Sequence, residues 1–296
     1  MGPGKDFALG HEFVGVIAEV GEAVENFKVG DRVAAPAALH SGFDHNSRIG
    51  QPQASENGGI FGSGDRGLGG AMAEKILVKY ADMNLSHIPD EVTDKQALAV
   101  GDIRSTGWTA VKEAITGPGQ TIVIQGCGPI GLAAVMTAKL SGATTIIASD
   151  TIDERIAAAK ELGATVVVNS MKENLVDVVM EHTDGYGADA TVEAAGVAPT
   201  INAWPEILRH GGKVGMVAIP RGEVSLPVAQ MVHKNISLWT GLGDLTKMDQ
   251  LMSFIRKGVI DPTPVFTHDY AFDDIEKAIA DVMDRKEGLI KPFIAV

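Results

Sequence analysis

The chain has 296 residues, of which 25 are Lys or Arg and 38 are Asp or Glu, so its net charge is −13. Hydrophobic residues make up 45% and charged residues 21%, which excludes a disordered chain and suits roughly two domains of about 150 residues. The acidic charge argues against a nucleic-acid or membrane surface, and the single cysteine excludes a disulfide framework and an all-cysteine zinc site.

The N-terminal third has the pattern of β-structure. Strands are expected over 13–20, 32–35 and 72–78, with Gly-rich punctuation between them. The segment 37–70 is rich in Gly, Ser, Asn and Asp and predicts a long surface loop, including solvated histidines at His40 and His45. The chain shows no signal peptide and no apolar run long enough to span a membrane, so a cytoplasmic location is expected.

From about residue 105 the pattern changes to alternating strands and helices. Six strands are expected over 121–124, 145–148, 166–168, 190–192, 213–217 and 236–239. Helices are expected over 129–141, 153–162, 173–182 and 200–209. This alternation predicts an α/β unit with a six-stranded, doubly wound parallel sheet. Two amphipathic helices, over 245–257 and 273–285, and a strand over 289–295 follow.

A glycine motif connects the first of these strands to its helix. The run is Gly126-Cys127-Gly128-Pro129-Ile130-Gly131, a G-x-G-x-x-G sequence in the strand–turn–helix context that dinucleotide binding requires. Asp150 ends the second strand, 19 residues after the last glycine, where a carboxylate accepts hydrogen bonds from the adenosine ribose and disfavours the phosphate of NADP. The pattern predicts NAD in preference to NADP. The alternative is a structural glycine turn followed by a surface aspartate.

Two further residues belong to the predicted cofactor site. Val217 ends the fifth strand, and Cys127 lies inside the glycine turn, where it is expected to act as a small apolar filler rather than a reactive thiol.

Several motifs resemble those of a known enzyme family. They are Gly10-His11-Glu12 before the first strand, Val29-Gly30-Asp31-Arg32-Val33, Asp102 ahead of Thr106-Gly107, the nucleotide motif, Val192-Glu193-Ala194-Ala195-Gly196, and Leu289-Ile290-Lys291-Pro292. Together they resemble the zinc-dependent medium-chain alcohol dehydrogenases, most closely the bacterial secondary-alcohol enzymes. The resemblance implies a β-rich GroES-like catalytic domain over 1–105 and 246–296 and a Rossmann domain over 106–245.

The resemblance also implies the metal site. His11 and Asp102 correspond to zinc ligands, Glu12 is an alternative ligand or a partner of the ligands, and all three are the expected catalytic residues. The family's first ligand, a cysteine, lies well upstream of Gly-His-Glu, but only ten residues precede His11 here. The catalytic domain is therefore expected to be N-terminally incomplete and to retain zinc weakly. A structural zinc is not expected, because 37–70 contains no cysteine.

The expected activity is hydride transfer between a secondary alcohol and NAD at a Zn²⁺ centre, giving a ketone or aldehyde. Two alternatives stay open: an NAD-dependent formaldehyde, polyol or amino-alcohol dehydrogenase of the same fold, and a catalytically silent dinucleotide-binding protein. Ile103 and Trp108 are expected either to line the substrate pocket or to pack in the core. The partners expected are a small alcohol or ketone and further copies of the chain, as a homodimer or homotetramer joined partly through 236–242.

Overall fold

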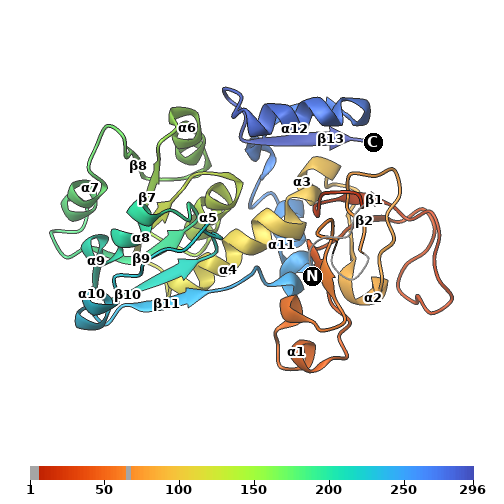
Figure 1. Cartoon of the computed structure of the whole chain (residues 1–296), viewed down its shortest axis with the longest axis horizontal. Helices are drawn as coiled ribbons and strands as arrows, with labels where there is room; N and C mark the ends of the chain where they lie inside the picture. The colour runs from red at the N-terminus through yellow and green to blue at the C-terminus, as the bar shows by residue number, and fades with distance from the viewer. Residues whose placement is uncertain (1–6, 65–67) are drawn as a thin grey trace. The chain divides into compact units, whose positions relative to one another are not determined.

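The structure, a computed structural model, describes residues 7–64 and 68–296 (Figure 1). The chain divides into two compact units. The β-rich unit comprises Met1–Ser105, Asp244–Arg285 and Pro292–Val296, and the α/β unit comprises Thr106–Gly243 and Lys286–Lys291.

The α/β unit is built on one parallel sheet of six strands. The strands are β6 (Thr121–Gln125), β7 (Thr145–Asp150), β8 (Val166–Asn169), β9 (Ala188–Glu193), β10 (Leu208–Met216) and β11 (Ser237–Thr240). Their order is β11-β10-β9-β6-β7-β8, and every neighbouring pair is parallel. The doubly wound sheet expected from the sequence is therefore confirmed, and its order reverses between β6 and β9.

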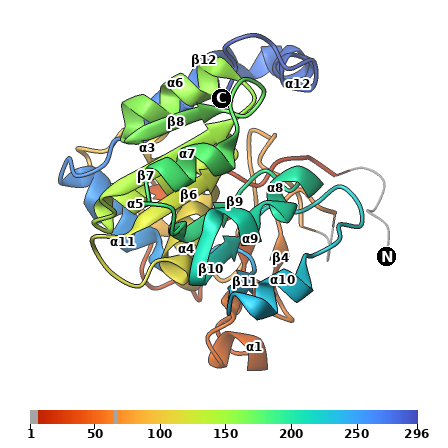
Figure 2. The ribbon, with the colours of Figure 1, turned by 90° about the vertical axis from the view of Figure 1, so that its left-hand side faces the viewer.

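Helices cover both faces of this sheet. One layer contains α4 (Ser105–Ala114), α5 (Pro129–Leu140) and α6 (Asp153–Leu162). The other contains α7 (Leu175–Glu181), α8 (Ala198–Asn202), α9 (Trp204–Ile207) and α10 (Val228–His233), and Figure 2 looks onto α7, α8 and α9. Buried Val123, Ile147 and Val168 from three adjacent strands pack with Trp204 on this second face. Strands buried on both faces explain the nearly continuous apolar runs in the sequence.

The predicted helix over 200–209 is wrong in its extent. The segment forms two short helices, α8 and α9, and β10 already begins at Leu208. Pro205 lies in the first turn of α9. Proline has no amide hydrogen to continue a helix and is tolerated only in a first turn, so the chain starts a new helix there.

The residues that the structure describes in the β-rich unit form three small sheets. Strands β1 (Val14–Val16), β2 (Arg32–Ala34) and β5 (Ser86–His87) form an antiparallel sheet in that order. Strand β3 (Ala38–Leu39) pairs with β4 (Gly59–Ile60), and β12 (Phe266–Ala271) pairs with β13 (Lys291–Ala295). The α-helices among the described residues of the unit are α1 (His45–Arg48), α2 (Ala81–Asn84), α3 (Asp94–Leu98), α11 (Met248–Arg256) and α12 (Ile275–Met283).

Two expectations for this unit need correction. The segment 72–78 forms no strand. Ile76 and Val78 pack against the core of Leu39, Phe61 and Leu68, whereas the Leu77 side chain is exposed. The strand-like composition is not sufficient for a strand, because a strand also needs a hydrogen-bonded neighbour. The region 37–70 is not a structureless loop, because it contains β3, α1 and β4, and His40 is buried rather than solvated.

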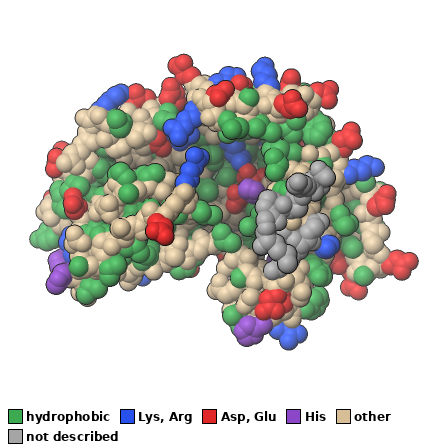
Figure 3. Space-filling view, in the orientation of Figure 1, with side chains coloured by type: hydrophobic (Ala, Val, Ile, Leu, Met, Phe, Trp, Pro, Cys, Tyr) green, Lys and Arg blue, Asp and Glu red, His purple; other side chains and the backbone are tan. Residues whose placement is uncertain are grey.

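The surface is mixed in character. On the face drawn in Figure 3, acidic and basic side chains are interspersed among apolar ones. Among residues 7–64 and 68–296, no helix has both the length and the apolar character needed to cross a lipid bilayer.

Candidate active site

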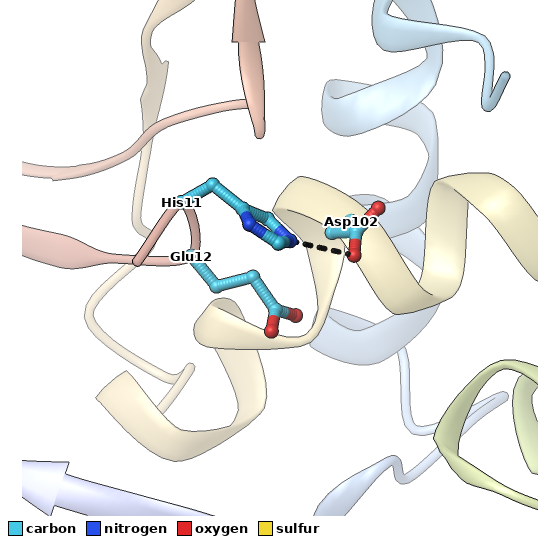
Figure 4. A group of neighbouring side chains, drawn as sticks. All are labelled: His11, Glu12 and Asp102. Carbon is cyan, nitrogen blue, oxygen red and sulfur yellow. Dashed lines mark hydrogen bonds and ion pairs between the residues drawn. The ribbon is translucent and has the colours of Figure 1, made fainter. Parts of the chain in front are cut away.

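Three potential metal ligands meet in the β-rich unit. His11 and Glu12 lie in the extended segment before β1, and Asp102 lies in a π-helical turn, Val100–Arg104, that joins α3 to α4 (Figure 4). His11 Nε2 is 3.3 Å from Asp102 Oδ2. One donor atom from each of His11, Glu12 and Asp102 lies within 4.8 Å of the other two. The structure therefore brings together three residues that span 91 positions in the chain.

Hydrogen bonds and close glycine packing hold the His11 segment in place. The amides of Ala71 and Met72 donate to the carbonyls of Gly10 and Leu9, at 2.9 and 2.8 Å. Gly10 has a φ of +89°, a conformation that side-chain-bearing residues rarely adopt. A Cβ at Gly62 would lie 2.4 Å from the Gly10 carbonyl oxygen, so only glycine permits this approach. The backbone ahead of His11 is thus held between Gly62 and residues 71–72.

The π-helical turn aims Asp102 at the same place. The Arg104 amide donates to the Ala99 carbonyl at 2.9 Å, the five-residue spacing of a π-turn. A Cβ on Gly101 would lie 2.2 Å from the Ala35 carbonyl oxygen, and the Ala37 amide donates to the Gly101 carbonyl. The turn therefore rests directly on the end of β2, next to the strand that follows His11.

The donor chemistry fits a zinc ion. Imidazole nitrogen and carboxylate oxygen bind zinc at roughly 2.0–2.2 Å, so two ligands of one tetrahedral ion lie roughly 3.3–3.6 Å apart. The separation of His11 and Asp102 already falls at this value. The side chains of His11 and Asp102 are 44% and 24% exposed, which leaves the site accessible to a small substrate. The one cysteine of the chain, Cys127, is buried in the glycine turn of the α/β unit, so this donor set is nitrogen and oxygen only.

The glycine motif forms the turn between β6 and α5. Gly126 has a φ of +92°, and a Cβ on Gly131 would lie 1.8 Å from the Gly126 carbonyl oxygen. Gly128 is the N-cap of α5, and a Cβ there would meet nothing within 4 Å. The first and last glycines thus serve packing, whereas Gly128 faces open space at a helix N-terminus, where amide groups are available to an anion. This arrangement fits the pyrophosphate of a dinucleotide.

Asp150 is engaged with backbone amides. Its Oδ2 accepts the amide of Cys127 at 2.7 Å, and its Oδ1 accepts the amides of Thr151 and Ile152 at 2.7 and 3.1 Å. Arg155 Nη1 lies 4.0 Å from Oδ2. The carboxylate therefore links the glycine turn to the end of β7, and the positive charge of Arg155 lies beside it.

Cys127 and Val217 are buried components of the same edge of the sheet. Burial, and then the Asp150 charge, raise the pKa of the Cys127 thiol, so it remains protonated and is not a nucleophile. The amides of Val217 and Ala218 donate to the Glu193 carbonyl at 3.2 and 3.1 Å. Ile103 and Trp108, the other pair singled out from the sequence, are also buried, which favours core packing over pocket lining.

Sequence reasoning missed Glu193 as a functional candidate. It is the last residue of β9, it is fully buried, and it meets Gln125, the last residue of β6. The signal in the sequence that could have identified it is a charged residue placed directly after the predicted strand over 190–192.

Comparison with known proteins places the chain in a family. Residues 129–257 match the zinc-binding dehydrogenase model, and residues 2–90 match the alcohol dehydrogenase GroES-like domain. An alcohol dehydrogenase of Cupriavidus necator is 34% identical over 309 residues, which cover 97% of this chain and 83% of the relative. The NADP-dependent isopropanol dehydrogenase of Thermoanaerobacter brockii is 34% identical, with coverage of 99% and 86%.

A solved structure agrees with the sequence relatives. The alcohol dehydrogenase TADH from Thermus sp. ATN1 is 32% identical and superposes with a TM-score of 0.92, covering 98% of this chain and 84% of that one. The chain therefore belongs to the zinc-dependent medium-chain alcohol dehydrogenase family. It is an oxidoreductase that acts on alcohols, and NAD(P) is the cofactor typical of its relatives.

Proposed function

We propose that the chain oxidises secondary alcohols to ketones, and reduces ketones in the reverse direction, with NAD as the hydride carrier and Zn²⁺ bound by His11, Asp102 and Glu12. The observation that carries this proposal is the convergence of the three donor side chains within 4.8 Å. The dinucleotide turn with Asp150 at the end of β7 supports the choice of cofactor.

The residues divide into two groups by role. When bound, Zn²⁺ supplies Lewis-acid polarisation of the alcohol oxygen and lowers its pKa. His11 and Asp102 would be direct ligands, and the nearby Glu12 carboxylate would complete the donor set or orient it. In the α/β unit, Gly126, Gly128 and the first turn of α5 would bind the pyrophosphate, and Asp150 would accept a ribose hydroxyl.

A second substrate class is supported by a specific observation. The L-threonine 3-dehydrogenase of Paraburkholderia phymatum is 30% identical over 285 residues, covering 95% of this chain and 81% of the relative. An amino alcohol would use the same metal residues, so only substrate comparison separates the two. NADP is the second cofactor candidate because the Thermoanaerobacter brockii relative is NADP-dependent.

The free edge of the six-stranded sheet bears on how copies of the chain assemble. Strand β11 lies at one edge of the sheet and pairs only with β10 among the described strands. We propose that a second copy of the chain pairs along this edge to form a homodimer, or a homotetramer built from such dimers.

We place the protein in the cytoplasm, where its single thiol stays reduced.

The decisive experiment measures zinc binding and activity together. Purified protein is titrated with Zn²⁺ by calorimetry and assayed with 2-propanol, 2-butanol and L-threonine in the presence of NAD. We expect measurable but weak zinc binding, loss of the metal on dialysis, and secondary-alcohol oxidation that depends on added zinc. His11→Ala and Asp102→Ala should each abolish zinc binding and activity, whereas His45→Ala, in exposed α1, should change neither. Zinc binding unchanged in both ligand variants would contradict the assignment.

A further inference from the structure

We propose that Glu193 is a positioning residue that holds the loops of the dinucleotide crevice in their binding conformation before the cofactor arrives. This inference rests on the proposed use of a nicotinamide dinucleotide. It concerns a residue that contributes through the backbone it orders rather than through contact with the cofactor.

The Glu193 carboxylate is fully buried and contacts three segments. Its Oε1 accepts the amides of Ala195 and Gly196 at 2.9 and 2.8 Å. Its Oε2 is 3.4 Å from the indole nitrogen of Trp204 in α9 and 3.5 Å from the side-chain nitrogen of Gln125 at the end of β6. One oxygen therefore closes the loop after β9, and the other lies against the neighbouring strand and the helix layer.

The backbone of Glu193 contacts a fourth segment. Its carbonyl accepts the amides of Val217 and Ala218, which follow β10. Beside it, the Ala194 amide donates to the Gln125 carbonyl at 2.9 Å. Through one residue, the chain segments that leave β6, β9 and β10 are joined in a single hydrogen-bonded cluster.

The cluster lies at the position in the sheet where ligands bind. Gln125 and Glu193 are register partners in β6 and β9, the two strands between which the strand order reverses. In open α/β sheets the ligand crevice lies outside the carboxyl ends of the strands at this reversal. A Cβ on Gly126 would lie 2.9 Å from the Ala195 nitrogen, so the first glycine of the motif packs directly on the loop that Glu193 closes.

A buried carboxylate is costly unless its hydrogen bonds compensate for lost hydration. Here burial is the larger effect and raises the pKa of Glu193, and hydrogen bonds from Gly196, Thr200, Ala195 and Trp204 offset only part of that rise. An apolar residue would fill the same space without this cost. What the carboxylate adds is an ordered 194–196 loop. Because this loop is already ordered, it does not have to lose conformational entropy when the cofactor binds.

The test compares NADH binding in matched variants. Glu193→Ala removes every hydrogen bond of the side chain, and Glu193→Gln keeps an oxygen that accepts the Ala195 and Gly196 amides. Asp189→Ala is the control, because Asp189 lies in the same strand at its opposite end and accepts the Thr121 amide and Arg209. Dissociation constants for NADH and NADPH are measured by calorimetry, with melting temperatures and kcat at saturating cofactor recorded in parallel.

We expect Glu193→Ala to raise the NADH dissociation constant at least tenfold, and Glu193→Gln to stay within about threefold of the parent. Asp189→Ala should lower the melting temperature but leave NADH affinity within twofold. If Glu193→Ala binds NADH like the parent, or if Asp189→Ala weakens binding equally, the inference is overturned. Binding of neither dinucleotide by the parent would instead contradict the proposed function.

Amide hydrogen exchange gives a readout that needs neither cofactor nor a folded alanine variant. In the parent without NADH, the amides of Ala195 and Gly196 should be protected, and Glu193→Gln should retain that protection. Exchange of these two amides at the rate expected for an unstructured peptide would overturn the inference.

Discussion

At the scale of single residues, Asp150 accepts hydrogen bonds from the backbone and is also proposed to bind the adenosine ribose. An ionised carboxylate offers about four lone-pair positions, and three backbone amides already use Asp150 in this structure. About one position remains for a ribose hydroxyl. One charge-assisted hydrogen bond contributes roughly 1.5–3 kcal/mol, which corresponds to about 10- to 150-fold in affinity.

Asp150→Asn should therefore reduce the preference for NAD. The amide side chain keeps one accepting oxygen, so it can hold either the Cys127 amide or the Thr151 and Ile152 amides, and it loses the charge that repels the NADP phosphate. Arg155, 4.0 Å away, is then no longer neutralised and can attract that phosphate. We expect the parent to prefer NAD at least tenfold and the variant to lose most of that ratio in titrations with both cofactors. Asp153→Asn, which removes a carboxylate paired with Lys172, should leave the ratio unchanged.

Asp44 predicts a pH effect on stability. Hydrogen bonds from Ser41, Ser55 and the Ser47 amide lower the pKa of Asp44 below its ordinary value of 3.8. Because the folded-state pKa is the lower one, the stabilisation is complete well above pH 3.8 and is lost as the pH falls below it. The melting temperature of Asp44→Asn should lie below that of the parent at pH 7, and the gap should narrow toward pH 3. A gap that stays constant with pH would show that ionisation of Asp44 does not contribute.

At the scale of elements, turns and short contacts decide the geometry of both sites. The π-turn that carries Asp102 and the glycine turn before α5 each depend on a glycine lying against a carbonyl oxygen. Such contacts are sensitive because packed backbone has no side-chain freedom with which to relax.

Gly131→Ala tests this dependence. The added Cβ would lie 1.8 Å from the Gly126 carbonyl oxygen, so the glycine turn and α5 must move apart. We expect a loss of about 1–3 kcal/mol in the free energy of unfolding and weaker NADH binding, measured by denaturant titration and calorimetry. Gly117→Ala is the control, since a Cβ there meets nothing within 4 Å. Equal effects of the two substitutions would contradict the packing argument.

At the scale of the whole molecule, the open edge of the six-stranded sheet predicts self-association. An edge strand presents unpaired backbone groups, and a charged side chain on it opposes strand pairing. Leu238→Lys in β11 should convert the proposed dimer of 31.0-kDa chains to monomers in light scattering. Val166→Lys, on the opposite edge strand β8, should leave the dimer intact. A dimer that persists in Leu238→Lys would place the interface elsewhere.

The sequence by itself determined the features that depend on local pattern. Alternating apolar runs and helical stretches predicted six strands and the doubly wound class, because burial on both faces leaves a local signature. The spacing of Gly126, Gly128 and Gly131 predicted the turn, since backbone freedom at glycine is a property of the residue itself. Histidine and carboxylates in family-like motifs identified His11, Glu12 and Asp102 as candidate ligands.

Only the tertiary structure decided what depends on distant neighbours. The strand-like composition over 72–78 could not supply a pairing partner, and the polar composition around His40 concealed its burial. The π-turn that brings Asp102 to His11, and the contacts that join Glu193 to Gln125, Trp204 and the loop after β10, link residues far apart in the chain. Hydrogen-bond pairing and desolvation are non-local interactions, so their partners are chosen by the fold and not by the surrounding sequence.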